Sequence, residues 1–262
     1  MHKLIWILSL SFFVSAVAFE GMTWKQMEAL YPLITPEDWE LAEPYLIPLD
    51  HEAIGILDTL FSDPLVLSNV QTLEVSGFKI IRYRRSKKLV VASHPKLKKY
   101  LIKAYLEDYN HYEVRNWASR ARGSHFIQTI LDENDLNHLF RVPRKWIYPL
   151  PRTKKTNFYH KNFILLVDKM DLLTEEQCKH KFKTQVSESF LLKLYEMIVL
   201  TGYSDCHLGN LPFCKDGKIA LIDLEYYNLE PVHMHKLSSH LSLKHQKLWK
   251  KLCSQKPKTA PP

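Results

Sequence analysis

The stretch YSDCHLGNLPFCKDGKIALIDLE, residues 203–225, contains the most specific pattern in this 262-residue chain. It sets Asp205, Asn210 and Asp223 among short apolar runs and turns. Asn210 comes five residues after Asp205, and Asp223 comes thirteen residues after Asn210. Two interpretations are open: a site that holds metal and phosphate, or three loop residues with no shared role.

The residues around these three side chains predict a helix, a loop and a hairpin. Apolar side chains recur on one face of a helix from 190 to 198, and Gly202 suits its C-terminal end. The runs LPF and KIALID predict a hairpin whose turn is Lys215-Asp216-Gly217. Such a hairpin would hold Asn210 and Asp223 at a defined separation.

The three residue types match the needs of phosphoryl transfer. One carboxylate, here Asp205, can orient or deprotonate an acceptor hydroxyl. An amide oxygen and a second carboxylate, here Asn210 and Asp223, can hold Mg²⁺ on the phosphates of a nucleotide, since this hard cation prefers oxygen ligands.

The finer pattern, D-C-H-L-G-N followed by I-D-L-E, resembles the aminoglycoside phosphotransferase and choline kinase-like branch of the protein kinase-like superfamily. That branch typically shows D-x-H-x-x-N and I-D-x-E, whereas the H-R-D and D-F-G of protein kinases are absent here. The resemblance implies that Asp205 is the catalytic residue and that Asn210 and Asp223 bind metal. His207 matches the loop pattern, and Tyr203 departs from it, because the family often has His there.

The segments upstream agree with this resemblance. Three apolar runs, GFKIIRY, KLVVASH and KYLIKAYL, predict consecutive antiparallel strands. Residues 112–139 predict a helix broken at Gly123, and KWIYPL and NFILLVDKM predict two more strands. By resemblance, Lys103 in the third strand binds the phosphates of ATP, Glu113 pairs with Lys103, and residues 167–173 form the hinge. The plainer alternatives are a lysine on an edge strand and a solvent-facing glutamate.

The chain departs from the family pattern in two further places. No G-x-G-x-x-G lies between the first two strands, where RYRRSKK stands instead, and side chains there cannot approach phosphate as closely as a glycine backbone. Only about forty residues follow Asp223, which implies a shortened second lobe. These departures motivate an alternative, a catalytically inactive pseudokinase that binds a nucleotide or a partner.

The N-terminus has the pattern of a secretory signal peptide. His2 and Lys3 precede an apolar run to Phe19, and Ala16 and Ala18 form an A-x-A site, so cleavage after Ala18 is expected. The run is shorter than the ~20 residues of a spanning helix, so we expect a secreted or periplasmic protein without a stable membrane span; an uncleaved anchor is the alternative. A helical N-terminal extension follows, with Thr35 as an N-cap and Asp50 as the expected cap of a second helix.

Charge and cysteine content leave several partners open. The net charge is +8, with basic groups at 82–88, at 94–100 and near the C-terminus. Such patches suit nucleic acid, an anionic membrane or a phosphorylated ligand, or they only keep the surface solvated. No nucleic-acid-binding motif is present, and no nucleic acid is expected. The sequence has four cysteines, Cys178, Cys206, Cys214 and Cys253. They either form disulfides in one of three possible pairings or remain free as small buried hydrophobic residues.

The sequence therefore predicts an α+β, protein kinase-like fold with a small antiparallel-sheet N-lobe and a mainly helical, shortened C-lobe. The predicted parts are a signal peptide (1–18), a helical extension (19–70), an N-lobe (71–168), a C-lobe (169–253) and a disordered tail (254–262). The expected activity is ATP- and Mg²⁺-dependent phosphoryl transfer to an unidentified hydroxyl-bearing small molecule or protein. A third possibility is a basic module that docks on an anionic surface.

Overall fold

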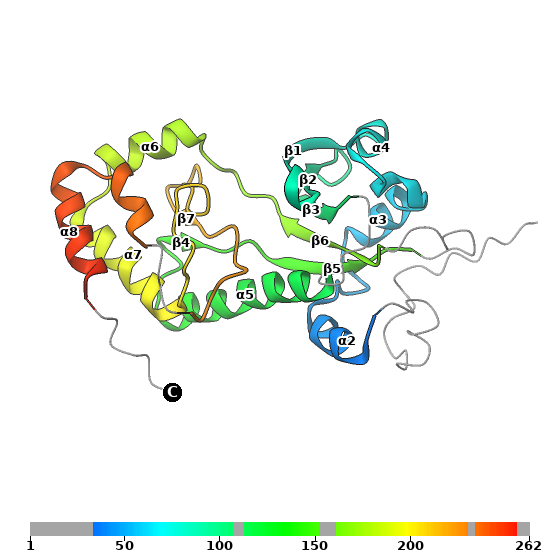
Figure 1. Ribbon diagram of the computed structural model, residues 1–262, viewed down its shortest axis with the longest axis horizontal. Helices are drawn as coiled ribbons and strands as arrows, with labels where there is room; N and C mark the ends of the chain where they lie inside the picture. Colours follow the sequence, from blue (N-terminus) through cyan, green and yellow to red (C-terminus); the bar gives the residue numbers. More distant parts are fainter. Residues whose placement is uncertain (1–33, 107–112, 152–160, 230–233, 256–262) are drawn as a thin grey trace, which may run out of the picture.

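The computed structural model describes residues 34–106, 113–151, 161–229 and 234–255, which form two lobes (Figure 1). One, which we call the sheet lobe, is built on a five-stranded antiparallel sheet, and the other, the helical lobe, is mainly α-helical. Helix α5 lies along both lobes in Figure 1. The fold class is α+β, as predicted, and the arrangement is consistent with a two-lobed kinase-like fold.

The sheet has the strand order β1-β2-β3-β6-β5, and every neighbouring pair is antiparallel. The five strands overlap the five predicted runs. Strand β3 lies at the centre of the sheet, so Lys103 is not on an edge strand. The strand bounds are β1 (Lys79–Arg84), β2 (Leu89–Ser93), β3 (Tyr100–Tyr105), β6 (Phe163–Asp168) and β5 (Lys145–Pro149).

Helices cover both faces of the sheet, because its strands alternate apolar side chains between two cores. Helices α3 (Ile54–Leu60) and α4 (Val70–Val75), with the 3₁₀ turn η3 (Pro64–Leu67), pack on the face that presents Ile102 and Leu166. Helix α2 (Pro36–Ala42) and helix α5 pack on the face that presents Ile147 and Leu165, and the 3₁₀ turn η2 (Glu43–Tyr45) packs beside them. The described part of the N-terminal extension therefore completes the core of the sheet lobe.

One of the two predicted helix caps is confirmed. The Thr35 hydroxyl accepts a hydrogen bond from the Asp38 N–H at 3.2 Å at the start of α2. The prediction for Asp50 is wrong, because α3 has Ala53 as its N-cap residue without a side-chain cap. The Ala53 N–H instead donates to Nδ1 of His51 at 3.2 Å. The chain thus enters α3 through a histidine that bonds to the backbone two residues ahead.

Helix α5 (Glu113–Glu133) runs through Gly123 without a break, contrary to the prediction of a broken helix. A side chain at Gly123 would meet the Leu224 carbonyl oxygen and the Tyr227 ring. The glycine therefore allows the segment that follows Asp223 to lie directly against the helix. Close approach of two backbones, and not a helix end, explains its position.

The helical lobe surrounds its own core. Helices α6 (Glu175–Thr184), α7 (Glu188–Thr201) and α8 (Leu243–Cys253) pack with the 3₁₀ segment η5 (Met234–His240). Two short strands, β4 (Phe140–Arg141) and β7 (Ile219–Ala220), pair in parallel. Gly202 ends α7 in the left-handed conformation, with φ of 57°, as predicted. Segment 169–174 links β6 to α6 at the edge between the lobes (Figure 1).

The predicted hairpin is present as a ladder of backbone hydrogen bonds. The N–H groups of Ile222, Ala220 and Cys214 donate to the carbonyls of Asn210, Pro212 and Lys218 at 3.2, 2.8 and 2.7 Å. Gly217 adopts a φ of 91° in the turn. The ladder joins the backbone of Asn210 to that of the residue just before Asp223.

All four cysteines are free thiols. In the described ranges no helix has the length and apolar character needed to cross a bilayer. The predicted signal peptide (1–18) and residues 256–262 of the predicted tail lie outside the described residues, and export remains a prediction.

Candidate active site

Asp205 and Asn210 are joined directly by hydrogen bonds. Both follow α7, in the loop that leads into the hairpin. The side-chain Nδ2 of Asn210 donates to the backbone carbonyl of Asp205 at 3.1 Å and to Oδ2 of the same residue at 3.0 Å. Both bonds use the amide nitrogen of Asn210, so its side-chain oxygen Oδ1 is the atom available to bind a ligand.

Two further groups contact the Asp205 carboxylate. Nζ of Lys236, from η5, lies 3.2 Å from Oδ1. Nε2 of His207 lies 3.5 Å from Oδ2, while Nδ1 of the same ring accepts from the Gly209 N–H at 3.0 Å. His207 therefore supports the loop, as the sequence pattern implied, and Lys236 was not among the predicted site residues.

Asp223 lies in the segment between the hairpin and residue 229, and this segment is fixed at both ends. The Ile222 N–H donates to the Asn210 carbonyl at 3.2 Å, and the Ser204 N–H donates to the Tyr226 carbonyl at 3.3 Å. The segment also lies against α5 at Gly123. Backbone contacts thus place Asp223 beside the loop that holds Asp205.

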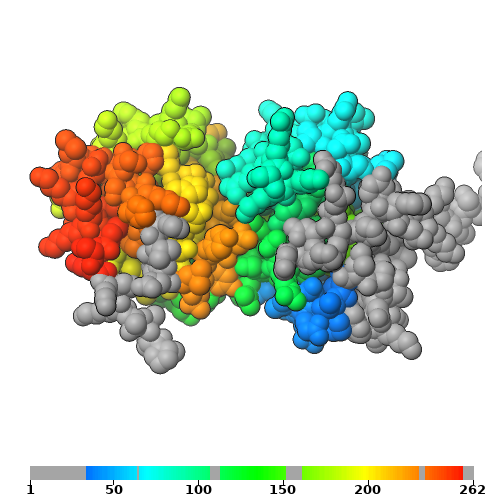
Figure 2. All heavy atoms as spheres, in the orientation of Figure 1, coloured from blue at the N-terminus to red at the C-terminus, as the bar shows by residue number. Residues whose placement is uncertain are grey.

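Lys103 of β3 reaches Asp223 across the boundary between the lobes. Its Nζ lies 3.8 Å from Oδ1 of Asp223, and only 15% of the lysine side chain is exposed. In the space-filling view of Figure 2, the orange residues of the helical lobe meet the green residues of the sheet lobe along a seam. The predicted lysine and the predicted metal carboxylate are therefore partners.

Arg120 is a buried member of the site that the sequence did not reveal. It projects from α5, with 4% of its side chain exposed. Its Nε lies 3.5 Å from Oδ1 of Asp223, and one terminal nitrogen binds Oε2 of Glu225 at 2.6 Å. The guanidinium thus connects two carboxylates of the I-D-L-E sequence to the helix, a contact that depends on how α5 is rotated against the segment.

Lys145, at the start of β5, is the second residue that sequence reasoning missed. It is 6% exposed, and its ammonium has no hydrogen-bond partner in the part of the chain that the structure describes. Its charge acts on Asp223, and the charges of Lys103 and Arg120 act on it. A basic residue that begins a strand normally extends into solvent, so its sequence context gave no sign of burial.

Glu113 does not join this group. It begins α5 and is 2% exposed, so it does not face solvent. Its Oε2 accepts a hydrogen bond of 3.5 Å from the Asn162 N–H. The acidic residues whose charges act on Lys103 are Asp223 and Glu225, so the helical partner of the site is Arg120 and not Glu113.

The concentration of charge perturbs the ionisable groups. Burial alone would raise the pKa of Asp223, but the positive charges of Lys103, Arg120 and Lys145 outweigh it, and the pKa falls to about 2. Burial lowers the pKa of Lys103, while Asp223 opposes that change. Asp223 is therefore an anion at every physiological pH.

Tyr203 is completely buried beside these carboxylates. Burial, the Cys206 thiol and the charges of Asp223 and Asp205 together raise the pKa of its hydroxyl well above the ordinary value. The phenol therefore stays neutral. Tyr203 therefore places an uncharged, buried ring at the start of the loop that carries Asp205.

The side chains present suit a magnesium ion bound with nucleotide. The Asn210 Oδ1 and the Asp223 carboxylate are hard oxygen donors, and Oδ1 of Asp223 is buried without a hydrogen bond from the described residues. No group of three or more His, Cys, Asp or Glu side chains that could hold a metal occurs within those residues. A metal here would need phosphate or water oxygens to complete its ligands, as Mg²⁺ usually does.

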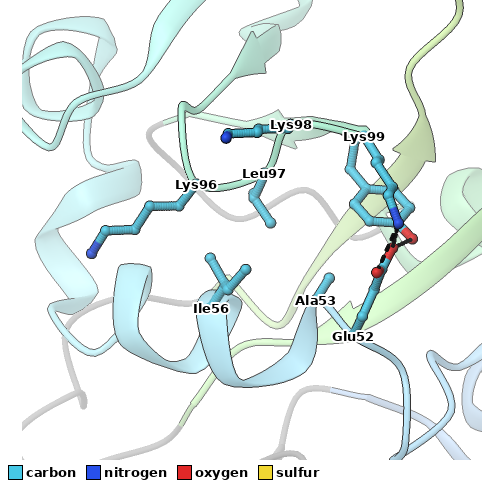
Figure 3. Close-up of a pocket in the computed structure, with 8 residues that line it drawn as sticks. Glu52, Ala53, Ile56, Lys96, Leu97, Lys98 and Lys99 are labelled. Atoms are coloured by element: carbon cyan, nitrogen blue, oxygen red, sulfur yellow. Dashed lines mark hydrogen bonds and ion pairs between the residues drawn. The ribbon is translucent and has the colours of Figure 1, made fainter.

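A separate hollow lies in the sheet lobe, between α3 and the β2–β3 connection (Figure 3). Figure 3 shows Ile56 and Ala53 opposite Leu97, and Glu52 bonded to Lys99 at one end. The volume of about 130 Å³ is below the roughly 300 Å³ at which ligand pockets begin. It contains none of the predicted site residues and does not compete with the site at Asp205 and Asp223.

Comparisons with known proteins add little to this geometry. No family model matches the chain, and no curated protein matches its sequence. One solved structure that resembles it is the complex of Rv3197 with erythromycin from Mycobacterium tuberculosis. The two share 11% sequence identity, and the match covers 92% of this chain and 71% of the other, with a TM-score of 0.36.

Proposed function

We propose that this protein is a kinase-like phosphotransferase that uses ATP and Mg²⁺ to phosphorylate a hydroxyl group. The observation that carries the proposal is that two pairs of predicted site residues lie in one place, at the boundary between the lobes. Lys103 of the sheet lobe reaches Asp223 at 3.8 Å, and Asn210 holds Asp205 at 3.0 Å. The hairpin ladder connects one pair to the other.

Each residue has a role that follows from its contacts. Asp205 receives the acceptor hydroxyl and takes its proton, while the bonds from Asn210 and Lys236 hold its carboxylate in one orientation. Lys103 neutralises phosphate charge, which is the main requirement of phosphoryl transfer. Asn210 Oδ1 and Asp223 would hold Mg²⁺, which supplies charge neutralisation on the phosphates when bound.

A second candidate is a pseudokinase that binds nucleotide or a partner without turnover. The observation that favours it is that Asp223 already interacts with two cations, Lys103 at 3.8 Å and Arg120 at 3.5 Å. Both would compete with a metal ion for the same carboxylate. The basic turn that replaces a glycine-rich loop points in the same direction.

The experiment that separates these candidates compares the wild type with Asp205→Ala. A thermal-shift titration with Mg-ATP measures binding, and ATP consumption measures turnover. For an active enzyme we expect both proteins to bind Mg-ATP and only the wild type to consume it above background. Asp132→Ala is the matched control, since Asp132 is exposed near the end of α5 and accepts a hydrogen bond from Gln128 at 2.8 Å.

Each remaining outcome has a defined meaning. Binding with equal background turnover in the wild type and in Asp205→Ala would favour the pseudokinase. No binding of Mg-ATP by the wild type would remove the phosphotransferase and the nucleotide-binding form of the pseudokinase, and only a partner-binding module would remain. Binding to anionic vesicles that weakens steeply with salt and ignores nucleotide would favour a basic docking module.

A further inference from the structure

Lys145 is a buried amine without a partner, in a position that its local sequence does not explain. The residue is 6% exposed, and Nζ accepts or donates no hydrogen bond among the residues described. A buried polar group without a partner destabilises the folded state, and a buried charge does so more strongly. Such a group calls for a ligand that compensates it.

The strand register places Lys145 on the same face of the sheet as Lys103. Lys145 is opposite Val167 on β6, and Lys103 is opposite Leu165 of the same strand. Val167 and Leu165 are two residues apart, so both point to one face. That face is covered by α5, which carries Arg120. Both lysines therefore project toward the site at Asp223.

The carboxylates nearby are already shared among other cations. Asp223 lies within 4.0 Å of Lys103 and Arg120, and Glu225 binds Arg120 at 2.6 Å. No ion pair within that distance joins Asp223 to Lys145 in the described part of the chain. Three basic side chains, those of Lys103, Arg120 and Lys145, thus face two carboxylates, and the charge of Arg84, at the end of β1, also acts on Asp223. Burial and the neighbouring cations lower the pKa of the Lys145 amine well below its ordinary value, and an anion bound beside it would favour its charged form.

We propose that Lys145 is a second phosphate-binding residue, which together with Lys103 binds the polyphosphate of a nucleotide. This inference rests on the proposed function and adds to it a specific binding group. It also explains how the site can dispense with a glycine-rich loop. Lysine side chains on the sheet replace backbone N–H groups as the phosphate ligands, since an ammonium binds phosphate as a point charge.

The test measures the binding of two probes. Sodium tripolyphosphate is used in the presence of a chelator, so that no metal contributes, and adenosine is the uncharged probe. The variants are Lys145→Met, which keeps the length of the side chain and removes its charge, and Lys103→Met for comparison. Lys99→Met is the control, because Lys99 is 72% exposed and pairs with Glu52. Calorimetry gives the affinities, and thermal unfolding without ligand gives the stability.

We expect Lys145→Met to weaken tripolyphosphate binding at least tenfold and to leave adenosine binding unchanged. It should also raise the unfolding temperature of the free protein, because it removes an amine that has no partner. Loss of a purely structural lysine would instead lower that temperature. If Lys145→Met does not fold, Lys145→Gln, which is also neutral, is expected to give the same loss of affinity.

Two outcomes would overturn the inference, and they are distinguishable. If the wild type binds tripolyphosphate and Lys145→Met binds it equally, while Lys103→Met does not, Lys145 has no part in phosphate binding and the proposed function stands. If the wild type binds neither tripolyphosphate nor Mg-ATP, the proposed function fails and the inference fails with it.

Discussion

The guanidinium of Arg120 lies 3.5 Å from Oδ1 of Asp223, so the longest described helix holds the carboxylate expected to bind metal. The same guanidinium binds Glu225 at 2.6 Å. The contact has two consequences. It fixes the segment that carries Asp223 against α5, and it places a permanent positive charge beside the carboxylate that would hold a metal ion.

Arg120→Met should lower the free energy of unfolding by about 3 kcal/mol, because removing one member of a buried ion pair leaves the other charge unpaired. Adding Glu225→Gln should restore part of this loss, since the orphaned carboxylate is then neutral. Urea unfolding measures both effects. The control is Arg144→Met, whose side chain is 73% exposed beside Asp168 and whose loss should cost below about 1 kcal/mol. If Arg120→Met lowers the free energy of unfolding by as little as the control does, Arg120 does not hold the Asp223 segment against α5.

Gly123→Ala should destabilise the protein by about 2 kcal/mol, a typical cost of overpacking. The new methyl group would meet the Leu224 carbonyl and lie 2.7 Å from the Tyr227 ring, and it would push the Asp223 segment away from α5. Gly55→Ala is the matched control in α3, where nothing lies within 4 Å of the added atom. That change should stabilise the helix by about 0.5–1 kcal/mol. Thermal unfolding measures both effects. If the two variants shift the unfolding temperature in the same direction, the segment does not pack against the helix.

Asp223→Asn should remove a stabilising contribution that depends on pH. The folded-state pKa is lowered from 3.8 to about 2, so the charged carboxylate contributes stability above pH 3.8 that is lost as the pH falls toward 2. The difference from the wild type should be about 2 kcal/mol at neutral pH and roughly half of that near pH 3. Urea unfolding with a chelator present, from pH 7 to pH 3, tests this. In a Lys103→Met background, Asp223→Asn should change the free energy of unfolding by a smaller amount. If the difference between the wild type and Asp223→Asn grows on acidification, the pKa of Asp223 is not lowered in the folded state.

Lys236→Met should separate turnover from binding. Lys236 contacts Asp205 at 3.2 Å, and its side chain is 38% exposed, so its removal should cost below about 1 kcal/mol of stability. If Lys236 orients Asp205 in an active enzyme, kcat should fall by roughly tenfold or more while KM for ATP stays unchanged. Lys193→Met is the control, since Lys193 is 47% exposed and pairs with Glu196 along one helix. Equal kcat values for the two variants would show that Lys236 has no positioning role.

Most of the elements could be predicted because their signals are local. The Thr35 cap, the glycine that ends α7 and the alternation within the strands each depend on residues that are neighbours in the sequence. The hairpin between Asn210 and Asp223 depends on a turn of a few residues. Local hydrogen bonding and side-chain period are properties of short segments, so the sequence reveals them without knowledge of the fold.

The charges around Asp223 were decided by tertiary structure. Lys145 lies on the same face of the sheet as Lys103 because β5 and β3 both pair with β6. Arg120 faces Asp223 because of the rotation with which α5 packs. The prediction that Gly123 breaks the helix was wrong for the same reason, since that glycine makes room for a segment a hundred residues later. Local sequence patterns were enough to predict the five strands of the main sheet, the hairpin and the Asp205–Asn210–Asp223 spacing. Only the packing of distant segments determined which charges meet, because Coulomb interactions depend on distance in space and not on separation along the chain.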